Sequence, residues 1–590
     1  MTSDQHSAQS MASQLDQRLM AMVGRSTGAL SVNQAIMSYI DWFNHLAVAP
    51  GHQFELLQTA LSNHLMLAQY LQACASRLPE VVVGEASPKA AGIENRPVTD
   101  RRFGADAWHN WPYNVMHQSY LLSEQWWRKA TTDVPGVNKH HADVVSFAAG
   151  ELLKLFSPRH YLFTNPELVQ HTIDQAGANL GRGAMNAIDD FTRNLSGKPV
   201  AGTQEFKVGE KVAVTPGKVI VRNQLMELIQ YEPLTGAVHP EPVLVIPAWI
   251  MKYYILDLSP ENSLIRYLLE QGFTVFCISW KNPGYAERNM GMDDYLDLGF
   301  NEAMKAINTL VPAQKVHALG YCLGGTLLSI AASAMARDHD DRLASMSMLA
   351  AQTEFSEPGE LSLFIDESQV TLLESVMADA GFLTSEQMAG AFQLLRSDYL
   401  IWSYMIDTYL KGERPALTDL MAWNADATRM PARMHSQYLR RLFLDNDLAE
   451  GRYPVKGKPV SLNDVTVPIF CLGTVTDHVA PWRSVYKIHL LTSSDITFVL
   501  TSGGHNAGVV TPPGHPKRCY QMLTRKVAEN YLGPDDWLTT APQFNGSWWP
   551  AWVQWLKQHS SGPVAPPSLG DSQKGYPVID AAPGQYVLEK

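Results

Sequence analysis

The chain has 590 residues, of which 46% are hydrophobic and 18% are charged, and its formal net charge is −12. This composition is typical of a large globular protein and excludes a disordered or fibrous chain. The negative charge is spread along the sequence, which argues against a general nucleic-acid-binding protein. No apolar stretch reaches the ~18 residues of a membrane-spanning helix, so we expect no transmembrane segment.

The N-terminus and the cysteines indicate the compartment. Residues 1–17 are polar and lack the apolar core of a signal peptide. The five cysteines are far apart and odd in number, so they predict neither a disulfide framework nor a Cys-x-x-Cys metal site. We therefore expect a cytoplasmic protein, because a reducing setting also keeps a catalytic thiol reduced.

The first part of the chain predicts helices. Residues 1–30 are expected to be a flexible N-terminus, and residues 31–204 a helical N-terminal domain with a linker at 79–101. Two apolar stripes at helical spacing support this expectation. The first stripe contains Ile36, Ile40, Phe43 and Ala47, and the second contains Phe54, Leu57, Leu61, Leu65 and Ala68.

From about residue 205, short β-rich runs replace the helical pattern. Helical stretches separate several of these runs, and this alternation predicts an α/β fold with a mostly parallel sheet covered on both faces. The runs lie at residues 228–231, 243–246, 274–280, 316–319, 346–349, 469–472 and 496–500.

Interruptions of this pattern divide the second part of the chain. The sheet is expected to span 205–350 and 463–560. Residues 351–462 lack β-rich runs and predict a helical cap, inserted over the carboxyl ends of the strands. Residues 561–590 are rich in Pro, Gly and Ser and predict a flexible tail.

The segment Gly320–Gly325, Gly-Tyr-Cys-Leu-Gly-Gly, carries the strongest chemical signal. It follows a predicted strand and precedes a run of small residues that predicts a helix. This is the arrangement of the nucleophile elbow in the α/β-hydrolase fold, with Cys322 where a serine usually stands. The start of the helix also favours a thiolate. The alternative is a buried structural cysteine between two glycine-rich bends.

Two residues that follow later strands complete a candidate triad. Enzymes with this fold place the nucleophile, an acid and a histidine in that chain order. Asp477 follows the run at 469–472, and His505 follows the run at 496–500. We therefore predict Cys322 as nucleophile, Asp477 as acid and His505 as base. His478, next to the acid, is a rival base.

An acyl-transfer site also needs donors for the developing oxyanion. The backbone N–H of Leu323, directly after the nucleophile, is the first expected donor, and that of Ile250, in the loop after the run at 243–246, is the second. A thiolate exchanges readily with a thioester, so Cys322 suits an enzyme that holds an acyl group and passes it to an alcohol. The chain has no Rossmann fingerprint, Walker A loop or zinc-ligand spacing, so no cofactor is expected.

Further motifs occur in order between residues 31 and 557. They are Tyr-Ile-Asp-Trp at 39–42, Asp-Arg-Arg-Phe at 100–103, Ala-Val-Thr-Pro-Gly-Lys-Val at 213–219, Lys-Tyr-Tyr-Ile-Leu-Asp-Leu at 252–258, Ser-Trp-Lys-Asn-Pro at 279–283 and Ser-Trp-Trp-Pro at 547–550. In these motifs and the Gly-Tyr-Cys-Leu-Gly-Gly box, the chain resembles the polyhydroxyalkanoate synthases, the poly(3-hydroxybutyrate) polymerase family, which polymerise 3-hydroxyacyl-CoA.

This resemblance implies roles for the site residues. Cys322 carries the acyl group, His505 is the base, and Asp477 orients His505 or assists the attacking hydroxyl. Residues that match family positions near the site are His478, Arg396, Asp257 and Trp423. One departure follows His505, where the family often has Ile-Ala-Gly and this chain has Asn506 in place of the Ile.

The resemblance also implies substrates and partners. They are (R)-3-hydroxyacyl-CoA, whose CoA is part of the substrate, and the growing polyester chain. Leu323 stands where medium-chain enzymes of the family usually have Ser, which favours short-chain (C4–C6) monomers. A homodimer at the surface of cytoplasmic polyester granules, with granule-associated proteins such as phasins as partners, is further implied.

Two other functions share these features. A cysteine-dependent α/β-hydrolase, such as a thioesterase or an esterase/depolymerase, would use the same triad but transfer the acyl group to water. A non-catalytic partner subunit would not need Cys322, Asp477 and His505 together.

Overall fold

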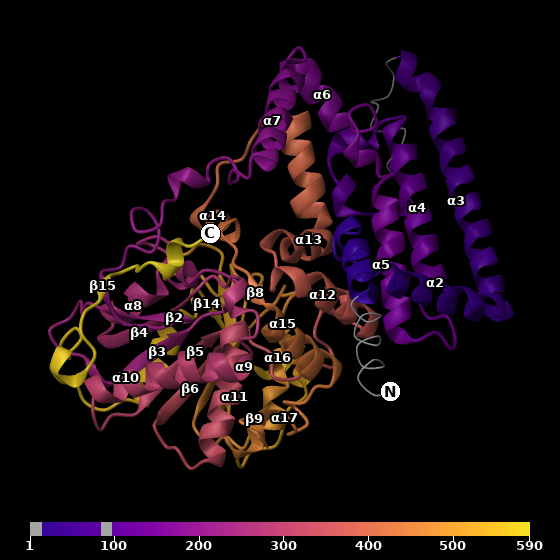
Figure 1. The fold of residues 1–590 in the computed structure, drawn as a ribbon. Helices are drawn as coiled ribbons and strands as arrows, with labels where there is room; N and C mark the ends of the chain where they lie inside the picture. Colours follow the sequence, from indigo (N-terminus) through magenta and orange to yellow (C-terminus); the bar gives the residue numbers. More distant parts are fainter. Residues whose placement is uncertain (1–14, 84–96) are drawn as a thin grey trace. The chain divides into compact units, whose positions relative to one another are not determined.

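The computed structural model describes residues 15–83 and 97–590, which form two compact units (Figure 1). The α/β unit comprises Val200–Gly390 and Leu417–Lys590, with the described part of Met1–Leu30. The helical unit comprises Ser31–Pro199 and Ala391–Ala416. The chain therefore passes between the units more than once.

A mixed sheet of eleven strands forms the centre of the α/β unit, in the order β14-β13-β12-β11-β6-β5-β3-β4-β2-β1-β15 among the described residues. Neighbouring strands from β12 to β4 are parallel. They are β12 (Ile496–Thr501), β11 (Ile469–Thr474), β6 (Leu343–Leu349), β5 (Val316–Tyr321), β3 (His239–Ile246) and β4 (Phe273–Trp280). The strands outside them are antiparallel: β14 (Gln543–Asn545), β13 (Cys519–Arg525), β2 (Met226–Tyr231), β1 (Gly217–Arg222) and β15 (Asp580–Ala581).

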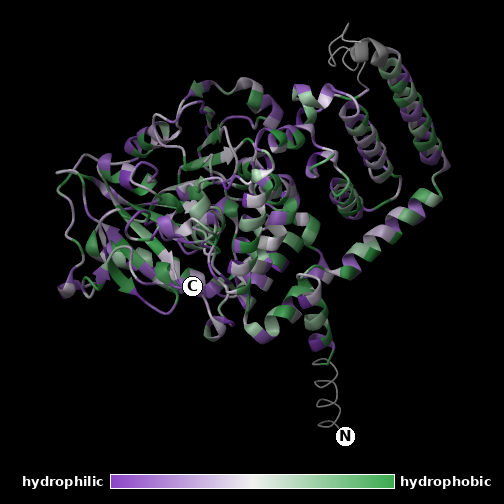
Figure 2. Cartoon of the chain, turned by 90° about the horizontal axis from the view of Figure 1, so that it is seen from above, coloured by the Kyte–Doolittle hydropathy of each residue, from purple (hydrophilic) through white to green (hydrophobic). Residues whose placement is uncertain are grey.

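Two hydrophobic cores cover the two faces of this sheet. In β5, Val316 and Ala318 belong to one core, while Leu319 and Tyr321 belong to the other. Alternate residues of a strand point to opposite faces, so a strand buried on both sides is apolar throughout. The helices of the first core include α10 (Glu302–Leu310) and α11 (Leu323–Arg337), and those of the second include α8 (Leu264–Glu270) and α19 (Trp549–Gln558). In Figure 2, hydrophobic residues occur along the strands and the helices beside them, and also along the helices of the helical unit.

The predicted α/β fold is confirmed, since each of the seven β-rich runs lies within a strand. The edge strands β1, β13, β14 and β15 were not predicted. The tail 561–590 was expected to be flexible, and the structure corrects this: β15 pairs with β1, and the carbonyls of Tyr586 and Glu589 accept hydrogen bonds from Lys252 Nζ at 3.2 and 2.6 Å. The pairing of β15 holds part of the tail on the edge of the sheet, and Lys252, which follows β3, holds its last residues.

The structure also differs from the expected boundaries. Residues 351–462 do lie between β6 and β11, but Ala391–Ala416 clusters with the helical unit instead of the cap. Of the predicted flexible N-terminus, residues 1–14 lie outside the described residues, and 15–26 are helical. Gly24 of this helix packs on α12 (Glu367–Ala380), where a Cβ atom at Gly24 would be 2.4 Å from Val376 Cγ2.

The helical unit confirms the predicted helices. They are α2 (Val32–Ala47), α3 (Pro50–Val83), α4 (Tyr113–Thr131), α5 (Lys139–Lys154), α6 (Pro166–Asp174) and α7 (Ala178–Leu195). Helix α3 extends into the predicted linker, of which residues 84–96 lie outside the described residues. Both predicted apolar stripes face solvent. Helix α2 buries Gln34, Ser38 and Trp42, so its apolar stripe marks the helical period but not the buried face.

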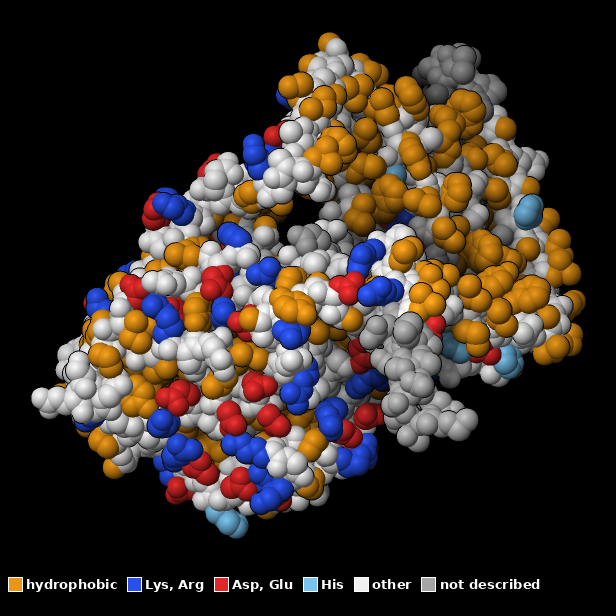
Figure 3. All heavy atoms as spheres, in the orientation of Figure 1, with side chains coloured by type: hydrophobic (Ala, Val, Ile, Leu, Met, Phe, Trp, Pro, Cys, Tyr) orange, Lys and Arg blue, Asp and Glu red, His pale blue; other side chains and the backbone are white. Residues whose placement is uncertain are grey.

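Apolar side chains gather on the surface of the helical unit (Figure 3). Phe43 is 51% exposed and Leu65 is 63% exposed. Within the described part of the chain, no helix combines the length and the hydrophobicity needed to cross a bilayer.

Candidate active site

Cys322 occupies a sharp turn between β5 and α11. Its backbone has φ 53° and ψ −123°, a left-handed conformation that is strained for a residue with a side chain. Such strain at a strand–helix turn is the geometry of a nucleophile elbow. The side chain is half-buried and packs against both hydrophobic cores. The turn therefore presents the sulfur at the carboxyl end of the sheet.

The glycines around Cys322 are required by close packing. A Cβ atom at Gly320 would be 2.4 Å from Gly325 Cα, and one at Gly324 would be 2.0 Å from Ile246 O. A Cβ atom at Gly325 would be 2.3 Å from Ala351 Cβ. Only glycine allows these approaches, so the motif brings the first turn of α11 against the end of β3.

Asp477 and His505 meet at the ends of β11 and β12. These strands are parallel, so the loops that follow them leave the same edge of the sheet. The N–H of Thr476 donates to Gly503 O at 3.0 Å and joins the two loops. His505 Nδ1 lies 2.8 Å from Asp477 Oδ2, while Asp477 Oδ1 accepts the N–H groups of Val479 and Ala480, each at 2.9 Å. The carboxylate is thereby fixed by backbone donors and aimed at the imidazole.

The electrostatic surroundings shift the pKa of His505 and the pKa of Asp477. Burial by itself lowers the pKa of His505, but the charges of Asp477 and Cys322 outweigh burial and raise this pKa well above its ordinary value. Burial also tends to raise the pKa of Asp477, yet the charge of His505 and the hydrogen bonds to the carboxylate lower it. The Asp477 carboxylate therefore favours the charged form of the His505 imidazole.

The other predicted residues take different places. Leu323 is the first residue of α11, where backbone N–H groups lack partners within the helix. Ile250 lies after β3 and packs against the first core, one of the two that Cys322 contacts. Its carbonyl accepts the N–H of Thr428. Asp477 directs Oδ2 at His505, which favours His505 over His478 as the base.

The structure places the other three residues implied by the family resemblance in different surroundings. Trp423 is buried in the second core, which Cys322 also contacts, and its indole donates to Lys252 O at 2.7 Å. The buried Asp257 accepts hydrogen bonds from Thr215 at 2.5 Å and Ser263 at 2.6 Å, which indicates a structural role. Arg396 belongs to Ala391–Ala416 of the helical unit, whereas the three triad residues belong to the α/β unit.

Two tyrosines near the nucleophile were not predicted. Burial and the charge of Cys322 raise the pKa of Tyr321 and the pKa of Tyr438. Tyr321 directly precedes Cys322, and its ring centroid lies 5.6 Å from that of His505. Tyr438 ends α15 (Ala432–Tyr438) in the cap. Position beside the nucleophile was an available signal for Tyr321, whereas cap folding alone brings Tyr438 close.

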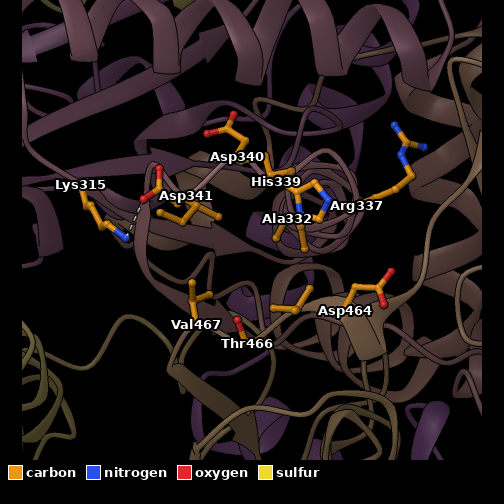
Figure 4. A pocket seen from close by; sticks show the side chains of 13 residues that line it. Lys315, Ala332, Arg337, His339, Asp340, Asp341, Asp464, Thr466 and Val467 are labelled. Carbon is orange, nitrogen blue, oxygen red and sulfur yellow. Dashed lines mark ion pairs between the residues drawn. The ribbon is translucent and has the colours of Figure 1, made fainter.

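A cavity of about 710 Å³ lies elsewhere in the α/β unit (Figure 4). Its lining includes Lys315 and Leu343, at the beginnings of β5 and β6, together with Arg337 at the end of α11. The ion pair between Lys315 and Asp341 measures 3.5 Å between Nζ and Oδ2. The cavity is therefore at the amino ends of the strands, whereas the triad is at their carboxyl ends.

Family models match most of the chain. The N-terminus of poly-beta-hydroxybutyrate polymerase (PhaC) matches residues 99–268, and the poly-beta-hydroxybutyrate polymerase N-terminal model matches residues 10–52. The alpha/beta hydrolase fold matches residues 241–512, which contain all three residues of the candidate triad. A solved monoacylglycerol lipase from Paleococcus ferrophilus is 12% identical and covers 57% of this chain and 99% of its own, with a TM-score of 0.33.

Curated relatives extend over both units. The poly(3-hydroxyalkanoate) polymerase of Methylorubrum extorquens is 40% identical over 84% of this chain and 81% of the relative. The poly(3-hydroxyalkanoate) polymerase subunit PhaC of Cupriavidus necator is 37% identical over 86% of this chain and 85% of the relative. The chain therefore belongs to the poly(3-hydroxyalkanoate) polymerase family of acyltransferases.

Proposed function

We propose that this enzyme polymerises (R)-3-hydroxyacyl-CoA through an acyl group held on Cys322. The observation that carries this proposal is the strained turn at Cys322 beside the ion pair of His505 and Asp477. A nucleophile, a base and a residue that orients the base are the components of covalent acyl transfer. No cofactor takes part, and CoA enters as part of the substrate.

In the first half-reaction, His505 accepts the proton of the Cys322 thiol. The thiolate attacks the thioester carbonyl, and the N–H groups of Leu323 and Ile250 stabilise the oxyanion. The carbon–sulfur bond to CoA then breaks as the bond to Cys322 remains. His505 returns the proton to the sulfur of CoA, which leaves as a thiol.

In the second half-reaction, the hydroxyl of another 3-hydroxyacyl unit attacks the thioester on Cys322. His505 takes the hydroxyl proton, an ester bond forms, and the bond to Cys322 sulfur breaks. The proton returns to that sulfur. Asp477 keeps the imidazole oriented and stabilises its charged form in both half-reactions, consistent with the 2.8 Å separation of Nδ1 and Oδ2.

We further propose short-chain (C4–C6) monomers. Leu323 is buried beside Cys322 in the first core, and a leucine occupies more space there than the serine of medium-chain enzymes. His478 and Trp423 support the site from the acid loop and the cap, respectively.

The enzyme is proposed to act at the surface of cytoplasmic polyester granules as a homodimer, with phasins as further partners. The exposed apolar surface of the helical unit supports attachment to a hydrophobic polymer (Figure 3). Contiguous apolar surface of this kind marks an interaction site in an otherwise water-soluble unit. Attachment would keep the growing chain and the enzyme together.

The test supplies the purified enzyme with C4, C6 and C8 (R)-3-hydroxyacyl-CoA in turn and follows CoA release and the product. Insoluble polyester from C4 and C6 is the expected result, with slower CoA release from C8. Release of CoA with free hydroxy acid and no polymer would instead establish a cysteine-dependent hydrolase. Equal rates with all three would contradict the short-chain proposal alone.

A further inference from the structure

The residue before Cys322 and the residue after His505 are hydrogen-bonded to each other. Tyr321 precedes Cys322, and Asn506 follows His505. The Tyr321 hydroxyl donates to Asn506 Oδ1 at 2.6 Å, so the two segments are joined one residue away from the sulfur and the imidazole. Tyr321 is only 2% exposed, which leaves its hydroxyl little access to water as a substitute partner.

The same amide reaches the cap. Asn506 Nδ2 donates to Asn424 Oδ1 at 3.3 Å, and Asn424 is the last residue of α14 (Asp419–Asn424). The Asn506 side chain therefore uses both of its polar atoms: the amide oxygen accepts from Tyr321, and the amide nitrogen donates to Asn424. Trp423, which precedes Asn424, packs in the same core as Tyr321. One side chain thus contacts the nucleophile strand and the cap from the loop that carries the base.

Hydrogen bonds to backbone carbonyls hold the rest of the His505 loop, and none of them involves the Asn506 side chain. The Asn506 carbonyl accepts the N–H groups of Val509 and Val510 at 3.1 and 2.9 Å. Trp548 Nε1 donates to Gly508 O at 3.0 Å. These bonds fix the loop to itself and to α19, whereas the amide of Asn506 fixes it to Tyr321.

We propose that Asn506 is a positioning residue, whose amide ties the His505 loop to the Cys322 strand and to α14 and so keeps the imidazole aligned with the thiol. This inference rests on the proposed function of Cys322 and His505. It assigns a role to the position at which the chain departs from the Ile-Ala-Gly pattern of similar enzymes. An isoleucine there has no donor or acceptor with which to make either bond.

Three substitutions separate the two bonds. Asn506→Ile removes both, Tyr321→Phe removes the bond to the strand, and Asn424→Ala removes the bond to α14. Tyr486→Phe is the matched control, because the Tyr486 hydroxyl donates to Leu532 O at 3.0 Å in the same unit but away from the triad. The control measures the effect of losing a buried tyrosine hydroxyl in general.

The first measurement is the pH dependence of Cys322 carbamidomethylation by iodoacetamide, quantified by mass spectrometry of the Cys322 peptide. A displaced imidazole stabilises the thiolate less, so the acidic midpoint of the curve should move to higher pH in Asn506→Ile and Tyr321→Phe. A shift of about one pH unit corresponds to a ~10-fold weaker pairing. The Tyr486→Phe curve should coincide with that of the unsubstituted enzyme.

The second measurement is CoA release from the preferred acyl-CoA. We expect kcat to fall ~10-fold in Asn506→Ile and Tyr321→Phe with little change in KM, because alignment acts on the chemical step. In Asn424→Ala the larger change should be in KM, since only the cap contact is lost. The double variant Tyr321→Phe/Asn506→Ile should be no slower than Asn506→Ile, because both substitutions remove the same bond.

Coincident alkylation curves and equal kcat for Asn506→Ile and the unsubstituted enzyme would overturn the inference, as would additive losses in the double variant. Alkylation does not require acyl-CoA, so it also separates this inference from the proposed function. A shifted curve in an enzyme that forms no polyester would reject the proposed function and retain the positioning role of Asn506.

Discussion

The two units use their apolar residues in opposite ways. In the α/β unit, β4 and β5 are buried along their whole lengths. In the helical unit, the residues that made α2 and α3 recognisable as helices are exposed, and α5 has no fully buried residue. Periodicity therefore identifies a helix in both units, but it does not identify which face is covered.

The number of covered faces explains why the two units differ in the burial of their apolar residues. A parallel sheet with helices on both faces has two interfaces, and its apolar residues go into both. Helix α3 buries the widely spaced Leu56, Asn63 and Tyr70, while Phe54 and Leu57 remain exposed. A unit of this kind keeps an apolar surface that a second surface can cover. The predictions that follow test whether the α/β unit carries the chemistry and the helical unit the surface contact.

Cys322→Ala should have the largest effect. Loss of the nucleophile removes the proposed covalent path, so CoA release should fall at least ~10³-fold while the fold is retained. The assay is CoA release, with circular dichroism as the check of folding. Cys519→Ala, a change of another half-buried cysteine, is the control and should keep activity. Normal CoA release by Cys322→Ala would show that Cys322 is not the nucleophile.

Asp477→Asn should lower kcat by about 10²–10⁴-fold, because the imidazolium loses the carboxylate that stabilises it. It should also change the pH dependence of stability. Because the folded-state pKa of Asp477 is lowered, its contribution is present above the ordinary Asp pKa of about 3.9 and is lost as pH falls through the folded-state value.

The alkaline side follows from His505. Its folded-state pKa is raised, so its contribution is fully present below the ordinary His pKa of about 6.5 and is lost as pH rises through the folded-state value. The melting temperatures of Asp477→Asn and the unsubstituted protein should therefore differ most between about pH 4 and 6.5. The difference should shrink as pH falls toward the lowered pKa of Asp477, and as pH rises toward the raised pKa of His505. A constant difference from pH 3 to 9 would show that the pair does not couple to folding.

Phe276→Ala and Phe43→Ala compare the same substitution in the two units. Phe276 is fully buried in β4, and its loss should reduce the free energy of unfolding of the α/β unit by about 3–5 kcal/mol. Phe43 is 51% exposed, and its loss should change stability by less than ~0.5 kcal/mol. Urea unfolding measures both. A similar loss of unfolding free energy in both variants would mean that Phe43 is buried in solution.

The triple variant Phe43→Ser, Leu61→Ser and Leu65→Ser tests the exposed surface. If the helical unit attaches to polyester, retention on poly(3-hydroxybutyrate) particles should fall at least ~10-fold, since one fully buried apolar side chain contributes ~1.5–3 kcal/mol and ~1.4 kcal/mol is a factor of ten. CoA release from soluble acyl-CoA should change little. Leu490→Ser is the control, because Leu490 is 60% exposed in the α/β unit. Equal loss of retention in both variants would assign no special role to the helical unit.

Gly181→Ala should have the smallest effect. A Cβ atom at Gly181 in α7 meets nothing within 4 Å, so alanine should stabilise the helical unit by about 0.5–1 kcal/mol. Gly183→Ala should destabilise it, because a Cβ atom there would be 1.9 Å from Tyr409 O. Opposite shifts in melting temperature are expected. Equal shifts would contradict the packing of α7 on Ala391–Ala416.

Sequence patterns predicted much of the catalytic region. Strand, glycine turn and helix around Cys322, and the order of Asp477 and His505 after later strands, follow from local signals that need no knowledge of packing. The same signals did not predict β15, because two residues paired at a sheet edge leave no alternation to detect. They also did not assign Ala391–Ala416 to the helical unit, because helical spacing carries no information about the partner.

The sequence by itself determined the helices of the N-terminal unit, the central strands and the candidate nucleophile, since each depends on residues close together in the chain. Tertiary structure alone decided which face of α2 and α3 is buried, and it alone brought Asn424, Asn506 and Tyr321 into one set of hydrogen bonds. The physical reason is that burial and side-chain pairing depend on segments far apart in sequence, whose meeting is decided by the packing of the whole unit.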